Sequence, residues 1–274
     1  MKNLFINKWN LLKVDIIFEI CDKGVYIVDS KLYGDSLLKI NSNSNLKNEY
    51  TYLKSFDSNY VCKVYDYDDK GALLLERIIP GTSLRNEIDL HKRLDVYYQV
   101  SNELHKYKND EFESYLDWFY KQVSYFAINN QYPLFQKQLS RAVDICEEIF
   151  SKYDNIITLH GDLHHDNILL NNDRYVVIDP KGVNGPPILE VGRFILNEMT
   201  FANDENASEY ILDVIVKVSD KFNYDLEDVQ KVFYMEVILA NAWNIEDGIE
   251  VNEKQMIVAS DILEWGINKK STDL

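Results

Sequence analysis

The side chains best suited to chemistry are concentrated in residues 157–170, ITLHGDLHHDNILL. A zincin-type metal site needs two histidines four residues apart on one helical face, whereas His164 and His165 are adjacent and would point in different directions. The stretch also contains no serine or cysteine that could act as a nucleophile. These observations disfavour both a zincin-type metal site and a covalent mechanism.

A carboxylate and an amide in the same stretch fit phosphoryl transfer better. Asp162 lies two residues after His160, Asn167 follows five residues later, and Asp179 ends the apolar run YVVID. Transfer from ATP needs a carboxylate that accepts the acceptor's proton and oxygen ligands that hold Mg²⁺. The spacing H-x-D-x-x-x-x-N, followed by a strand and a second aspartate, is typical of a kinase catalytic loop. Asp and Asn also favour turns, but the order of these residues favours catalysis.

The same chemistry predicts further residues upstream. A lysine on the third strand should hold the nucleotide phosphates, and a glutamate on the next helix should hold that lysine. Lys39 lies in SLLKI and Glu49 lies in NLKNEYTYL, in the expected order. Most such residues are ordinary surface charges, but the downstream loop favours a functional pair. The turn CDKG, with Gly24 as its one glycine, is a candidate cover for phosphates that lacks the full G-x-G-x-x-G pattern.

The elements around these residues predict an α+β fold with two lobes. Short strands at 15–20, 25–32 and 36–40, a helix at 45–56 and two strands within 61–78 form a small antiparallel sheet. The Pro-Gly of IIPGTS then breaks regular structure. Helical spacing follows, interrupted by the hairpin pair NILL and YVVID, at residues 86–107, 113–129, 134–152, 187–201, 207–221 and 225–245. We therefore expect a β-rich nucleotide-binding lobe at residues 1–78 and a helical lobe at residues 79–274.

The charge restricts the partners. The 274 residues carry a net charge of −16, which repels nucleic acids and anionic membranes and favours a cationic small molecule. An acidic surface also often only keeps a protein in solution.

The three cysteines are widely separated, so neither a disulfide framework nor a zinc site is expected. The first residues do not have the pattern of a signal peptide. We predict a cytoplasmic protein that is a monomer or a weak dimer.

Four motifs carry a family resemblance: GALLLERIIPGTSLR, HGDLHHDNIL, IDPKG and GRFILN. They resemble the aminoglycoside phosphotransferase superfamily, and within it the streptomycin 6-kinase branch, which is grouped with the hydroxyurea phosphotransferases. The resemblance implies a two-lobed protein-kinase-like fold. It also implies transfer of the γ-phosphoryl group of ATP, with Mg²⁺, to a hydroxyl of a cationic acceptor such as streptomycin. Another sugar, amino alcohol or antibiotic is the alternative acceptor, and a nucleotide-binding pseudokinase is the alternative class.

The resemblance also assigns roles to individual positions. It makes Asp162 the catalytic base, Asn167 and Asp179 the Mg²⁺ ligands, and Lys39 with Glu49 the phosphate-binding pair. The remaining family positions are Glu76 and Ile78, whose main chain would meet adenine, and Lys181, which follows the metal aspartate without a derived role.

The acceptor site has weaker signals in the sequence. The acidic, aromatic stretch NAWNIEDGIE could form a wall of a cation pocket, with a solvated helix end as the equal alternative. Glu190 either helps to form that site, buttresses the catalytic loop or caps its helix. Residues 108–155 carry no recognisable motif. The candidate substrate residues are therefore Glu190, Trp243, Glu246 and Asp247.

Overall fold

The chain forms two compact units in a computed structural model. The described residues are 2–20, 23–41, 46–56, 59–127, 133–203, 205–246 and 248–272. The first unit comprises Met1–Glu103 and His165–Gly182. The second unit comprises Leu104–His164 and Val183–Leu274.

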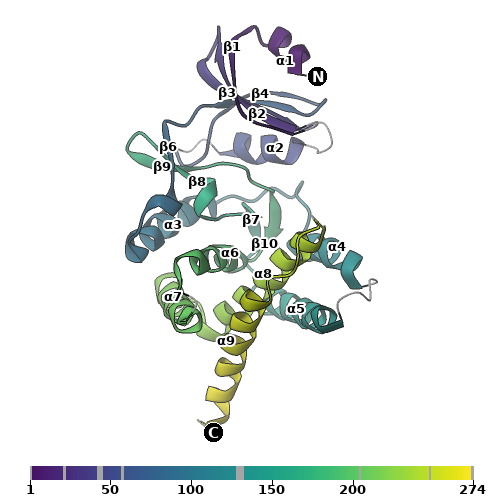
Figure 1. Cartoon of the computed structure of the whole chain (residues 1–274), viewed down its shortest axis with the longest axis vertical. Coiled ribbons are helices and arrows are strands. Elements are labelled where there is room, and N and C mark those ends of the chain that lie inside the picture. The colour runs from purple at the N-terminus through teal and green to yellow at the C-terminus, as the bar shows by residue number, and fades with distance from the viewer. Residues whose placement is uncertain are drawn as a thin grey trace. The chain divides into compact units, whose positions relative to one another are not determined.

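A five-stranded antiparallel sheet forms most of the first unit (Figure 1). Its strand order is β1-β2-β3-β5-β4, for β1 (Leu11–Ile20), β2 (Lys23–Ser30), β3 (Gly34–Asn41), β5 (Ala72–Glu76) and β4 (Val64–Asp68). Side chains of β2 and β3 alternate between buried and less buried positions, as expected for strands that cover a core with one face. Helices α1 (Lys2–Lys8) and α2 (Lys47–Ser55) lie in this unit, and Phe5 of α1 completes the core.

A second sheet, of three strands, belongs to the same unit. Its strands are β6 (Pro80–Ser83), β8 (Ile168–Asn171) and β9 (Arg174–Val177), and all pairs are antiparallel. An isolated parallel bridge links Val61 to Val177. The segment that we expected to break regular structure after residue 78 is therefore strand β6, which pairs with β8. Because of this pairing, the first compact unit extends to Glu103 and includes His165–Gly182. We had expected a single division between residues 78 and 79.

Helix α3 (Leu90–Leu104) begins four residues later than expected because an aspartate caps it. Oδ1 of Asp89 accepts hydrogen bonds from the backbone N–H groups of His91 and Lys92, at 2.8 and 3.3 Å. A carboxylate in this position satisfies donors that have no partner inside the helix.

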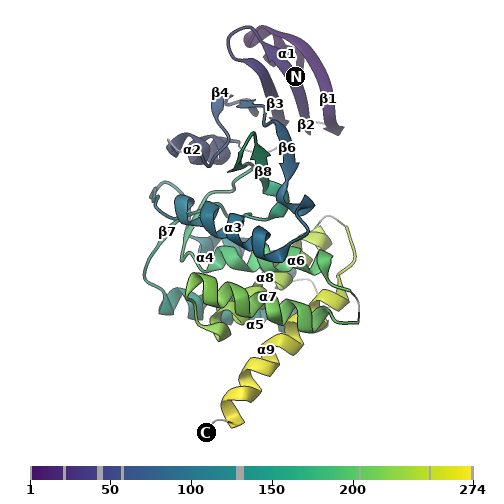
Figure 2. The ribbon, with the colours of Figure 1, turned by 90° about the vertical axis from the view of Figure 1, so that its left-hand side faces the viewer.

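The second unit is mainly helical, with one small two-stranded sheet. Helix α8 packs against five other helices and is buried along most of its length (Figures 1 and 2). A helix that neighbours cover along most of its length needs no continuous solvated face. The sheet pairs β7 (Ile157–Leu159) with β10 (Val183–Gly185). The helices are α4 (Tyr115–Ala127), α5 (Pro133–Lys152), α6 (Leu189–Glu198), α7 (Ala207–Phe222), α8 (Leu226–Glu246) and α9 (Glu253–Thr272).

The predicted α+β class, with an N-terminal antiparallel sheet and a larger helical part, is confirmed. Residues 108–155, which carried no motif, contribute α4 and α5. Within the described ranges, no helix combines the length and the apolar character needed to cross a bilayer.

Candidate active site

Lys39 in the first unit lies between two carboxylates. Its Nζ atom is 2.7 Å from Oε2 of Glu49 on α2 and 2.7 Å from Oδ1 of Asp179. Burial alone would lower the pKa of Lys39, but the attraction of Glu49 and Asp179 outweighs this effect, so the pKa is raised. The ammonium group is thus held charged, in the state needed to bind phosphate.

Asn167 and Asp179 flank the end of the β8–β9 hairpin. The register pairs Ile168 with Val177, and the backbone N–H of Ile178 donates to the carbonyl of Asn167 at 3.0 Å. This bond makes Asn167 and Asp179 near neighbours. Asp179 has a φ of 58°, in the left-handed region that few residues other than glycine adopt. Such backbone strain is concentrated at functional sites.

This pair is suited to Mg²⁺. An amide oxygen and a carboxylate are hard ligands, and the Asp179 side chain is 43% exposed, so it can reach a bound ion. The described part of the chain holds no cluster of three or more His, Cys, Asp or Glu side chains arranged for a metal. Magnesium typically takes only one or two protein carboxylates and completes its shell with phosphates and water. The two residues therefore fit a metal that arrives with a nucleotide.

A cavity of about 440 Å³ lies in the first unit beside Lys39. This volume is within the usual range for small-molecule sites. Glu76, Arg77 and Ile78 line it together with Lys39, Glu49 and Asp179. The rest of its wall includes apolar side chains of the sheet, namely Ile17, Val25, Ile27, Leu37 and Leu75. The cavity thus combines an apolar wall with a charged group of side chains.

Gly24 does not lie in the turn where it was expected. It is part of β2, opposite Glu19 of β1 and Ile40 of β3, and only residues 21 and 22 separate the first two strands. A Cβ atom at Gly24 would lie 2.3 Å from the Tyr26 hydroxyl, so the glycine makes room for that side chain.

Asp162 lies in the second unit, on the loop after β7. Its backbone N–H donates to Nδ1 of the fully buried His160 at 3.3 Å. The preceding Gly161 has a φ of 79°, and its N–H donates to Oε1 of Glu190 at 2.7 Å. The other Glu190 oxygen lies 3.0 Å from Nε2 of His105. The buried Glu190 therefore contacts the loop backbone directly.

An arginine that we did not predict lies beside Asp162. Nε of Arg193, on α6, is 3.1 Å from Oδ1 of Asp162 and 2.9 Å from Oε1 of Glu236 on α8. Its guanidinium carbon lies 4.5 Å from the ring centre of Trp243. Burial raises the pKa of Glu236 to about 7, with Arg193 acting to lower it and Asp162 to raise it. The GRFILN motif was the one sequence signal for Arg193, and Glu236 had none.

The other candidate substrate residues differ in their contacts and exposure. Trp243 is partly buried, donates from Nε1 to Oε1 of Gln122 at 2.9 Å, and its ring contacts Trp118. The Trp243 ring, which we expected to contact a cationic substrate, thus contacts the guanidinium of Arg193. Glu246 is exposed at the end of α8, and Asp247 lies outside the described residues.

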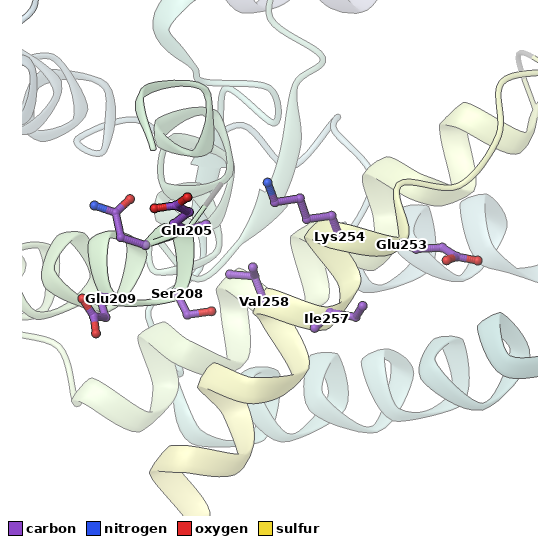
Figure 3. A pocket seen from close by; sticks show the side chains of 9 residues that line it. Glu205, Ser208, Glu209, Glu253, Lys254, Ile257 and Val258 are labelled. Carbon is purple, nitrogen blue, oxygen red and sulfur yellow. The ribbon is translucent and has the colours of Figure 1, made fainter. Parts of the chain in front are cut away.

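A second cavity, of about 630 Å³, lies between the start of α7 and α9 (Figure 3). Its walls carry charges of both signs, and the Glu253 carboxylate points away from Glu205 and Ser208 in Figure 3. None of the predicted site residues lines this cavity. The predicted residues Lys39, Glu49, Glu76, Ile78 and Asp179 line the cavity of the first unit instead.

The fold is kinase-like, and the family match and similar structures support a small-molecule phosphotransferase. A family description, aminoglycoside/hydroxyurea antibiotic resistance kinase, matches residues 24–248. The chain belongs to this family. Among curated proteins, no sequence match is found.

Solved structures of low sequence identity share the fold. A thermostable mutant of the aminoglycoside phosphotransferase APH(4)-Ia, in a ternary complex with ADP and hygromycin B, is 14% identical with a TM-score of 0.66 over 96% of both chains. The choline kinase LicA from Streptococcus pneumoniae is 15% identical with a TM-score of 0.67, over 96% of this chain and 99% of that chain. The amicoumacin kinase hAmiN, in complex with AMP-PNP, Ca²⁺ and Ami, is 13% identical with a TM-score of 0.69, over 96% and 93%.

Proposed function

We propose that this chain transfers the γ-phosphoryl group of ATP to a hydroxyl of an aminoglycoside of the streptomycin type. The observation that carries the proposal is the contact of Lys39 with both Glu49 and Asp179 beside a cavity of about 440 Å³. This arrangement supports a phosphate-binding lysine held in place by a helix glutamate. The apolar wall of the cavity suits an adenine ring, with the main chain of Glu76 and Ile78 as its partners.

Each of the predicted site residues would have a separate role in phosphoryl transfer. Lys39 binds the phosphates, and Glu49 keeps its ammonium group in position. Asn167 and Asp179 hold Mg²⁺, which neutralises phosphate charge when bound. Asp162 orients the acceptor hydroxyl and takes its proton, a role that typically contributes ~10²- to 10⁴-fold in rate.

The acceptor assignment is supported by family and charge. The chain belongs to a family of aminoglycoside and hydroxyurea resistance kinases, and its net charge of −16 attracts cations. Hygromycin B is bound by APH(4)-Ia, a protein of the same fold. Glu246 and Trp243 stay candidates for the acceptor wall because they lie at the end of α8, in the unit that carries Asp162.

The direct test is ADP release from Mg·ATP in the presence of streptomycin, with the product identified by mass. The proposal expects streptomycin-dependent ADP and a singly phosphorylated product. Asp162→Ala should bind ATP and lose turnover. Phosphorylation of a different amine or sugar would keep the reaction and change the acceptor, whereas nucleotide binding without any transfer would favour the pseudokinase alternative.

A further inference from the structure

Arg193 lies 3.1 Å from Oδ1 of Asp162, closer than His164 at 3.7 Å, and the proposed reaction gives it no role. We propose that Arg193 is a positioning residue, whose guanidinium fixes the orientation of the Asp162 carboxylate and is itself held by Glu236 and Trp243. The inference rests on the proposed function, because the consequence of this orientation is the rate of proton transfer from the acceptor.

The contacts enclose the guanidinium on several sides. Nε lies 3.1 Å from Oδ1 of Asp162 and 2.9 Å from Oε1 of Glu236, and Trp243 covers the plane of the group at 4.5 Å. The side chains of Arg193, Asp162 and Glu236 are 13%, 16% and 4% exposed. All four residues belong to the second unit, so these contacts lie within one compact body.

Close packing of two helices brings the arginine to this place. Gly192 precedes Arg193 on α6, and a Cβ atom there would lie 2.8 Å from the carbonyl oxygen of Val232 and 3.1 Å from Cβ of Glu236. The absence of a side chain lets α6 and α8 approach each other. Glu236 then reaches Arg193 from α8.

Trp243 is itself fixed, which makes it a firm support. Its indole N–H donates to Gln122 on α4 at 2.9 Å, and its ring packs edge-on against Trp118 at 5.8 Å between ring centres. A guanidinium over an indole face gains cation–π attraction, and its flat shape suits stacking. Arg193 therefore has little freedom to rotate.

The cost of removing Arg193 and Glu236 from water indicates that this ion pair has a role besides stability. Glu236 is buried and Arg193 is mostly covered. Neither Oε1 of Glu236 nor Nε of Arg193, both buried atoms, has an aligned hydrogen-bond partner within the described residues, despite their short separation. Burying such a pair removes hydration that the ionic attraction only partly replaces, so well-packed apolar residues are often equally stable. An orienting role for the arginine at Asp162 explains why a charge is present at this position.

A displaced base slows proton transfer, since a shift of about 1 Å can reduce turnover by about 10²-fold. Arg193→Ala alone would leave the buried Glu236 without its counter-ion and could prevent folding. The informative comparison is therefore between Glu236→Gln and the double variant Arg193→Ala/Glu236→Gln, in which no uncompensated carboxylate remains.

The assay measures kcat and KM for ATP and for the acceptor that the unmodified chain phosphorylates, with unfolding midpoints as a check of folding. The double variant should have a kcat about 10²-fold below that of Glu236→Gln, with an unchanged KM for ATP. Adding guanidinium ions at millimolar concentration should partly restore the kcat of the double variant. The kcat of Arg193→Lys should lie between those of the parent and the double variant. The matched control is Arg141→Ala, which removes an arginine that lies over another α8 ring, Tyr234, and should keep full turnover.

Three results would overturn the inference: equal kcat in the double variant and in Glu236→Gln, a folded double variant that guanidinium fails to restore, or a lower KM for the acceptor with kcat retained. The last result would mean that Arg193 competes with the cationic acceptor. Failure of the proposed function is distinct, because the unmodified chain would then transfer no phosphoryl group. Crystal structures of the two variants decide the inference in that case, since a rotated Asp162 carboxylate only in the double variant supports it and an unmoved one contradicts it.

Discussion

The Nζ atom of Lys39 lies 2.7 Å from Oδ1 of Asp179, although 140 residues separate them in sequence. This contact joins the predicted phosphate-binding lysine to a predicted Mg²⁺ ligand. The ion pair stabilises two charges that the bound nucleotide and its metal would otherwise satisfy. Nucleotide binding should therefore exchange the contact for contacts with phosphate and Mg²⁺.

Asp179→Ala should weaken Mg·ATP binding, because it removes a metal ligand. The dissociation constant, measured by calorimetry with and without Mg²⁺, should rise in the variant and lose most of its dependence on Mg²⁺. Asp173→Ala is the matched control, since Asp173 is an exposed carboxylate in the turn of the same hairpin. Unchanged Mg²⁺ dependence in Asp179→Ala would remove this residue from the metal site.

Asp162→Ala should keep its affinity for Mg·ATP and lose turnover, in contrast to Asp179→Ala. Because Asp162 belongs to the second unit and the nucleotide cavity to the first, nucleotide affinity should be retained. Turnover should fall by about 10²- to 10⁴-fold, the usual contribution of a general base. Single-turnover measurements with saturating Mg·ATP check this directly. Phosphorylation at the unmodified rate would show that Asp162 is not the base.

Glu190→Ala should destabilise the catalytic loop. The substitution leaves the Gly161 N–H without the acceptor that lies 2.7 Å away, and such a loss costs about 1–3 kcal/mol. Glu190→Gln retains an acceptor oxygen and should lose less of the free energy of unfolding. Urea unfolding of both variants distinguishes them. Stabilities equal to that of the parent in both would mean that Glu190 does not buttress the loop.

Gly192→Ala tests the close approach of α6 and α8. The added methyl group would meet the Val232 carbonyl oxygen at 2.8 Å and Val232 Cγ1 at 2.9 Å. Overpacking of this kind costs about 1–3 kcal/mol. Adding Val232→Ala removes only the side-chain clash, so the double variant should regain little stability. Full recovery in the double variant would locate the strain in the Val232 side chain and not in its backbone.

Glu236 predicts a pH dependence of stability. Its pKa is about 7 in the folded chain, raised from 4.5 chiefly by burial. The folded state therefore binds a proton more tightly than the unfolded state does. The resulting stabilisation is complete below about pH 4.5 and is lost as the pH rises through about 7.

Urea unfolding of the parent and of Glu236→Gln between about pH 5 and about pH 8 measures this effect. The free energy of unfolding of the parent should fall relative to that of the variant, by on the order of 3 kcal/mol across the full range. The control Glu209→Gln changes an exposed carboxylate on α7 and should follow the parent. Parallel pH curves for Glu236→Gln and the parent would exclude Glu236 as the titrating group.

The sequence predicted the elements that have strong periodicity and the residues that lie in short motifs. Strands β2 and β3 alternate clearly, and Asp162, Asn167 and Asp179 fall within one stretch of chain, so local spacing was informative. The short elements α1, β6, β7 and β10 were missed, because three to seven residues carry too little periodicity. Helix α9 was also missed, although Met256, Ala259 and Leu263 recur at helical spacing and are buried.

Long-range packing set the limits of prediction. Residues 193 and 236 meet only because α6 and α8 pack closely at Gly192, and nothing local to either residue reveals this. The first unit takes in residues 165–182 because β6 pairs with β8, a partnership that no short motif encodes. Contacts between side chains on separate helices therefore require a structure.

The most direct test of the central claim is incubation of the unmodified chain with Mg·ATP and a panel of aminoglycosides, other hydroxylated amines and hydroxyurea, followed by mass spectrometry. Our account predicts that a cationic, hydroxylated acceptor of the streptomycin type gains one phosphoryl group while ADP is released in equal amount. It also predicts that Asp162→Ala forms both products about 10²- to 10⁴-fold more slowly. Binding of ATP without phosphorylation of any member of the panel, or equal product from Asp162→Ala, would contradict it.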